Sequence, residues 1–224
     1  MFGFSAAANE IYINQVGDSL DLDIVQDGQD NQFGDSTTDA SLTGNDMTFS
    51  ITQTGSYNDI AAVINGNSYT GTWAFTGDYN TVALTCDSAG TNCENITLNI
   101  TTTGDTNDYT FAIGGTADAD GSTIAFTVTG DNNIVDTTVD GKSVALSVTV
   151  DNSASLATTS ANSDEGNKIT INSSGNGDTL GNTVTLDITG GGSTYDVTQS
   201  GIYDNTVDAT FNGDSQDVDI TQSD

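Results

Sequence analysis

The sequence predicts an all-β protein, a β-solenoid of about eight to nine two-stranded coils with about 22 residues per coil and irregular loop insertions. Three observations lead to this fold class. The 224 residues include 25 glycines, no proline and 34% hydrophobic residues, and the abundant Thr, Asn and Asp favour turns and short strands over helices. Glycines recur every eleven residues, and apolar residues alternate between them.

The glycine spacing defines the repeating unit. Glycines eleven residues apart are Gly17 and Gly28; Gly44, Gly55, Gly66 and Gly77; Gly104 and Gly115; Gly130 and Gly141; and Gly190 and Gly201. After Gly44, alternate residues are Met47, Phe49, Ile51 and Gln53. Because side chains alternate between the two faces of a strand, we expect these four to point into the core together.

One unit, a turn and a short strand, cannot cover its own apolar face and must stack on copies of itself. The third residue after the glycine alternates between Asn and another residue, as in Met47, Asn58, Tyr69 and Asn80. Two strands therefore make one coil. Trp73 lies in the inward register, where we expect it to fill the core.

The coils are predicted to form one domain, residues 9–224, preceded by an apolar attachment segment, residues 1–8. Longer insertions are expected around residues 33–43, 86–93, 115–121, 152–165 and 175–181. The second of these contains Cys86 and Cys93, where a local disulfide is possible and one close pair fixes no redox compartment.

Amide side chains are expected to stack along the solenoid. Neighbouring strands lie about 4.8 Å apart, so Asn lies above Asn and Gln above Gln, within hydrogen-bonding reach. The predicted amide ladder consists of Asn9, Asn31, Asn58, Asn80, Asn107, Asn133, Gln15, Gln26, Gln53, Gln199 and Gln222.

These repeats carry a family resemblance. The segments Gln53-Thr-Gly55-Ser-Tyr-Asn58 and Gln26-Asp-Gly28-Gln-Asp-Asn31 resemble the curlin repeat of bacterial curli fibre subunits, and degenerate copies cover most of the chain. More Asp, irregular insertions and the lack of a recognisable signal peptide set the chain apart from secreted curli subunits. It is more similar to curlin-repeat proteins encoded by marine bacteriophages, which implies a structural component of a virion.

The N-terminus has no basic segment and too short an apolar stretch for a signal peptide. We therefore expect either a cytoplasmic product or a mature form whose signal was removed. The repeat begins at Asn9 and continues to Gln222 without a visible cap, and exposed strand edges favour pairing with other strands. The predicted attachment residues are Phe2, Phe4, Val218 and Ile220.

Charge restricts the partners. Two basic residues against 32 acidic ones give a formal net charge of −30, which repels nucleic acid and anionic membranes. No segment approaches the ~18 apolar residues of a membrane span. The expected partners are other copies of the chain or other virion proteins.

Catalysis and cofactors are not expected. The chain has no His, the usual general base. Calcium is a candidate ligand for Asp118-Ala-Asp120-Gly121, Gly77-Asp78-Tyr-Asn80 and Gly104-Asp105-Thr-Asn107, whose oxygens suit hard cations. Asn, Asp and Gly also tolerate the left-handed backbone conformations of turns. We therefore prefer a purely structural role for these residues over calcium binding.

The sequence thus predicts a non-enzymatic structural protein of a phage virion, as a fibre, appendage or decoration element located in the virion. The first alternative is an extracellular curli-type functional-amyloid subunit. A polysaccharide-binding or polysaccharide-cleaving tailspike is the second.

Overall fold

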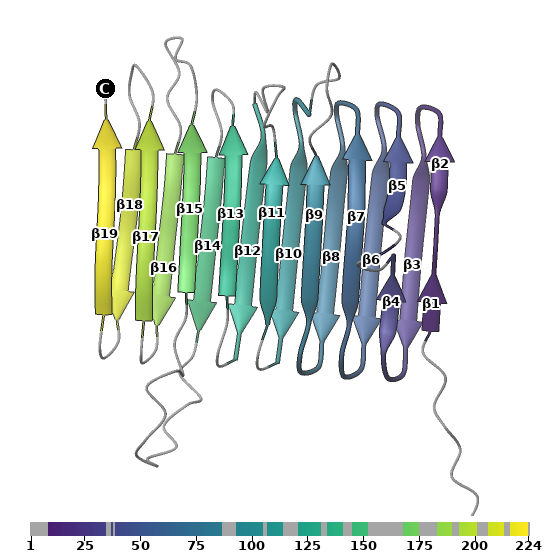
Figure 1. Cartoon of the computed structure of the whole chain (residues 1–224), viewed down its shortest axis with the longest axis horizontal. Coiled ribbons are helices and arrows are strands. Elements are labelled where there is room, and N and C mark those ends of the chain that lie inside the picture. The colour runs from purple at the N-terminus through teal and green to yellow at the C-terminus, as the bar shows by residue number, and fades with distance from the viewer. Residues whose placement is uncertain are drawn as a thin grey trace, which may run out of the picture.

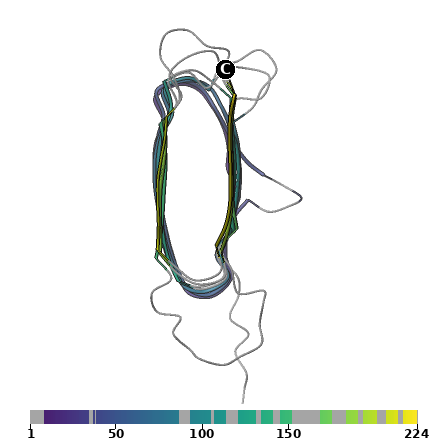
Figure 2. The ribbon, with the colours of Figure 1, turned by 90° about the vertical axis from the view of Figure 1, so that its left-hand side faces the viewer.

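The chain folds into a β-solenoid with parallel strands, which confirms the predicted all-β class (Figures 1 and 2). The structure, a computed structural model, describes residues 9–34, 37, 39–86, 93–104, 107–113, 121–130, 134–140, 145–151, 168–174, 183–189, 193–200, 206–212 and 216–223. Within these ranges all regular elements are strands.

Two sheets face each other across the core (Figure 2), and successive strands alternate between them except for β1 to β2 and β4 to β5, which stay in one sheet. The first sheet has eleven strands in the described ranges: β1 (Asn9–Ile11), β2 (Asn14–Val16), β4 (Asn31–Phe33), β5 (Ala40–Thr43), β7 (Asp59–Asn65), β9 (Thr81–Cys86), β11 (Asp108–Ile113), β13 (Ile134–Asp140), β15 (Lys168–Ser174), β17 (Ser193–Ser200) and β19 (Gln216–Ser223). The second has eight: β3 (Asp21–Asp27), β6 (Thr48–Thr54), β8 (Thr70–Thr76), β10 (Thr97–Thr103), β12 (Thr123–Thr129), β14 (Ala145–Asp151), β16 (Thr183–Thr189) and β18 (Thr206–Asn212).

The register follows the predicted repeat where no insertion intervenes. Thr48 of β6 pairs with Thr70 of β8, which is 22 residues later. Asp21 of β3 pairs with Thr48, 27 residues later. The longer step spans residues 34–39, which separate β4 from β5 within one level of the first sheet. The predicted insertion at 33–43 is therefore narrower, because Phe33 and residues 40–43 belong to strands.

The two corners of the solenoid differ, and we name them by the side chains that they bury. The amide corner carries the turns that begin at Gly28, Gly55, Gly77 and Gly104, and the apolar corner carries those at Gly17, Gly44 and Gly66. The inward residue after the Gly17 turn, Leu20, is half-buried, and the corresponding residues on later levels, Met47, Tyr69, Ile96 and Ser122, are buried. At the amide corner the corresponding residue is Asn.

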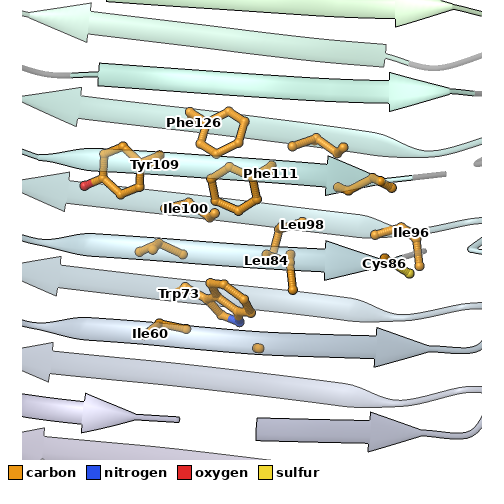
Figure 3. Packing of buried hydrophobic residues seen from close by; sticks show 14 of the residues in the cluster. Ile60, Trp73, Leu84, Cys86, Ile96, Leu98, Ile100, Tyr109, Phe111 and Phe126 are labelled. Atoms are coloured by element: carbon orange, nitrogen blue, oxygen red, sulfur yellow. The ribbon is translucent and has the colours of Figure 1, made fainter. Parts of the chain in front are cut away.

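The core lies between the two sheets, and its buried residues in the described part range from Ile24 in β3 to Leu186 in β16; Figure 3 shows a section of it. Met47, Phe49, Ile51 and Gln53 are all buried, so the inward register predicted from Gly44 is confirmed. Trp73 is also buried, with its ring centroid 5.9 Å from that of Phe49.

A second aromatic group lies further along the stack. The ring centroids of Phe111 and Phe126, which come from opposite sheets, are 4.6 Å apart, and Tyr109 packs against both (Figure 3). Burial raises the pKa of the Tyr109 phenol above its ordinary value, although its hydrogen bond with Thr102 opposes this. Aromatic contacts therefore join the two sheets.

We expect Phe111→Ala to lower the free energy of unfolding by about 3–5 kcal/mol, because it leaves a cavity between the sheets. The matched control is Thr110→Ala, since Thr110 is exposed on the opposite face of β11. That variant should stay within about 0.5 kcal/mol of wild type. Urea unfolding of both variants checks this, and equal midpoint shifts would refute the inward assignment.

Candidate functional site

The most distinctive internal feature is the asparagine part of the amide ladder, which lies along the amide corner. Its described members, called the asparagine file below, are Asn9, Asn31, Asn58, Asn80 and Asn107. Asn31, Asn58, Asn80 and Asn107 each follow a turn glycine by three residues and have buried side chains, whereas the residue three before Asn9 is an alanine. The turn backbone is held in place because Asn58, Asn80 and Asn107 each donate a hydrogen bond to the carbonyl of the glycine three residues earlier, Gly55, Gly77 and Gly104 respectively. One side chain thus closes its own turn.

The second N–H of each amide joins successive coils. Asn9 Nδ2 donates to Asn31 Oδ1 at 2.9 Å, and Asn31 Nδ2 donates to Asn58 Oδ1 at 2.9 Å. Asn58 donates to Asn80 at 2.7 Å, and Asn80 donates to Asn107 at 2.6 Å. All four bonds point the same way along the stack, and such aligned amide dipoles strengthen one another.

Burial makes this file energetically important. Asn31, Asn58, Asn80 and Asn107 are at most 1% exposed, so their polar groups have no solvent to replace a lost partner. Asn9, in the first strand, is exposed. Asn133 lies outside the described residues.

The glutamines form a shorter arrangement. Gln53 Nε2 donates to Gln26 Oε1 at 2.7 Å, and both side chains are buried. The next residue in this column is Phe75, so the glutamine contact ends there. Gln15 pairs with Leu42 instead of another Gln, and its amide donates to the Gly17 carbonyl at 2.9 Å.

The remaining predicted ladder and attachment residues lie near the ends of the chain. Gln199 and Gln222 are backbone partners in β17 and β19. Phe2 and Phe4 fall outside the described residues. Val218 and Ile220 in β19 are 40% and 42% exposed. Tyr109 and Phe111 occupy the same columns within the stack and are at most 1% exposed.

A second polar ladder, on the outside of the apolar corner, was not predicted. Asp18 Oδ1 accepts the backbone N–H of Asn45 at 2.8 Å, and Asn45 Oδ1 accepts that of Asn67 at 2.9 Å. Asn67 Oδ1 in turn accepts the Glu94 N–H at 3.2 Å. The signal in the sequence is an Asp or Asn directly after Gly17, Gly44 and Gly66.

Two tyrosines at the outside of the amide corner were also missed. Tyr57 and Tyr79 are 55% and 49% exposed, and their rings stack with centroids 4.9 Å apart and planes at 9°. Each lies two residues after its turn glycine, one coil apart. That shared position could have indicated the pair.

Cys86, at the end of β9, and Cys93 form a disulfide, with Cα atoms 6.0 Å apart. Both cysteines are buried. The bond joins the two ends of the insertion at 86–93. From the sequence alone, this disulfide was possible but not decided.

The described ranges contain no group of three or more His, Cys, Asp or Glu side chains that could hold a metal. Of the turns considered for calcium, Asp78 is exposed, while Asp105, Asp118 and Asp120 lie outside the described residues. No helix capable of crossing a membrane occurs in the described part. No known protein family, curated protein or solved structure matches the chain.

Proposed function

We propose that the chain is a structural protein that joins a larger assembly by stacking end to end with further copies. The observation that carries the proposal is the exposure of Val218 and Ile220. Their positions in β19 belong to the inward register, and in the same two columns Tyr109, Phe111, Val135 and Thr137 are buried between the sheets. Covering them with an equivalent strand would remove apolar surface from water.

The backbone at this end supports the same proposal. β19 pairs with β17, and β18 pairs with β16, so each has one edge that pairs with no other described strand. Unpaired N–H and C=O groups at a sheet edge are a template for an added strand. At the other end, Ile11 and Ile13 are half-buried beside the core and could receive such a strand.

The outward faces favour stacking at the ends over lateral association. No Asp or Glu is among the buried residues of the described part, so the carboxylates lie at the surface. At about 0.1 M salt their repulsion extends over about 10 Å. Two parallel rods would therefore repel each other along their length, while an end contact buries apolar and amide side chains.

A bacteriophage virion is the setting that the curlin-like repeats suggest, with the chain as a fibre, appendage or decoration element of eight to nine coils. The Cys86–Cys93 disulfide is compatible with this, because disulfides persist on virion surfaces and in other oxidising environments. The same bond favours the alternative of a secreted curli-type subunit. Gene neighbours that encode capsid and tail proteins would distinguish the first setting from the second.

The test is Ile220→Asp in the full chain, with Val25→Asp as the control. Val25 is 76% exposed on the outer face of β3, so both variants add one carboxylate to a strand near an end. We expect wild type and Val25→Asp to form concentration-dependent oligomers in sedimentation velocity, and Ile220→Asp to weaken them at least about tenfold, since a charge on the covered face must be desolvated. A monomeric wild type at high micromolar concentration, or unchanged association of Ile220→Asp, would contradict stacking.

A further inference from the structure

A groove of about 400 Å³ lies at the outside of the amide corner, next to the outer face of the first sheet. The stacked rings of Tyr57 and Tyr79 form part of its lining. Asp30, Gln32, Asp59 and Thr81 supply most of the rest. It therefore combines an exposed aromatic pair with carboxylate, amide and hydroxyl oxygens.

The stacking of the coils brings these residues together. The Asp30 N–H donates to the Ser56 carbonyl, and the Tyr57 N–H donates to the Asp78 carbonyl, each at 2.9 Å. Asp30, Tyr57 and Tyr79 thus occupy one turn position on three successive levels, with φ of 53°, 61° and 59°. Tyr79 stacks on one face of the Tyr57 ring, and Asp30 lies one level away from Tyr57 in the opposite direction along the stack.

This combination suits an organic cation. The π face of a tyrosine attracts an ammonium or guanidinium group, and a neighbouring carboxylate adds charge attraction and a hydrogen-bond acceptor. No basic residue lines the groove, which contains two carboxylates. A bare metal ion would make no use of the aromatic pair, and a neutral sugar, although its hydroxyls can donate to the carboxylates, would leave their charge uncompensated.

We propose that this groove binds an organic cation, with its ammonium or guanidinium group between the Asp30 carboxylate and the open face of Tyr57. Gln32 and Thr81 offer further oxygen acceptors at the sheet face for the remaining N–H groups of the ligand. The site lies on the side of the solenoid, so its occupation does not depend on association through the ends.

The test is an NMR titration of the full-length protein in 0.15 M NaCl with N-acetyl-arginine amide and, separately, spermidine, which distinguish a basic side chain from a free polyamine. We expect at least one of them to produce saturable shifts at the Tyr57 and Tyr79 rings. Tyr57→Leu and Asp30→Asn should each weaken binding about tenfold, whereas Tyr57→Phe, which keeps the ring, should bind like wild type.

Asp46→Asn is the matched control for charge. Asp46 occupies the same turn position at the apolar corner, with φ of 55°, and no aromatic residue follows it on the next level, where Ser68 stands. This variant should bind like wild type. Equal weakening by Asp30→Asn and Asp46→Asn would mean diffuse attraction by net charge and would overturn the site.

Two other outcomes would also overturn the proposal. The first is equal binding of glucose at the same tyrosines, which would indicate a neutral sugar platform and favour the polysaccharide-binding alternative. The second is full retention of cation affinity in Tyr57→Leu. Thermal unfolding of each variant, monitored by circular dichroism, shows whether a loss of binding accompanies a loss of fold.

Discussion

Replacing Gly55 by alanine is expected to lower the free energy of unfolding by about 3–5 kcal/mol, because backbone strain and a steric clash add together. Gly55 has φ of 149°, a conformation that L side chains rarely adopt. A Cβ placed there would lie 1.4 Å from the carbonyl oxygen of Gly28, one level away. That oxygen belongs to the backbone of a hydrogen-bonded turn, so it cannot rotate away as a side chain could.

Gly17→Ala separates the two contributions. Gly17 has nearly the same conformation, with φ of 141°, but it lies in the first coil, and the nearest atom to the alanine Cβ would be Gln15 Nε2 at 3.5 Å. This variant should lose only the strain energy, about 1–3 kcal/mol. Urea unfolding gives both values, and equal losses at the two positions would show that the glycines do not stack closely.

The second large effect is expected for Asn58→Leu, which should cost about 3 kcal/mol or more although leucine is more apolar. Asn58 donates to Gly55 and Asn80 and accepts from Asn31. The substitution leaves these three groups without their partner at a buried site, and each unpaired buried group costs about 1–3 kcal/mol. Urea unfolding measures the loss.

Two comparison variants show whether the lost hydrogen bonds cause the destabilisation by Asn58→Leu. Asn58→Asp keeps the shape of the side chain but replaces the donor by a buried charge, so it should be at least as destabilising as Asn58→Leu. Asn99→Leu changes an exposed asparagine on β10 and should stay within about 0.5 kcal/mol of wild type. A small loss for Asn58→Leu, similar to that for Asn99→Leu, would mean that the file contributes little to stability.

The inward register could be predicted from the sequence because it is a local property. Alternation along a strand follows from strand geometry, and the turn glycine sets its phase. Phe49 and Ile51 could therefore be assigned to the core from Gly44 alone. The asparagine file was predictable for the same reason, since all of its described members except Asn9 lie three residues after a glycine.

Contacts between coils were less predictable, because each insertion changes the sequence distance between partners. Gln15 and Gln26 occupy the last inward position of their units, and each meets a residue 27 positions later, which is Leu42 for Gln15 and Gln53 for Gln26. Only the pairing register between strands shows that one glutamine meets another glutamine and the other meets a leucine. The splitting of one level into β4 and β5 also depends on tertiary pairing and has no local signal.

Surface pairs such as Tyr57 and Tyr79 escaped prediction for another reason. Turn positions tolerate many residue types, so a tyrosine there has no obvious structural meaning in one copy of the repeat. Its significance arises only when two copies lie one level apart with their rings in contact. Repeats in this fold should therefore be compared coil by coil, with insertions allowed for, before surface residues are interpreted.

The central claim, that coils stack in register through a continuous file of asparagine amides, is tested most directly by NMR. Nuclear Overhauser contacts between side-chain amide protons should link Asn31 to Asn58 and Asn58 to Asn80, pairs that are 27 and 22 residues apart. We predict that both contacts are present and that these amide protons exchange slowly with solvent, since they are buried. Absence of both contacts, with rapid exchange of the Asn58 side-chain protons, would contradict the file and the register that it requires.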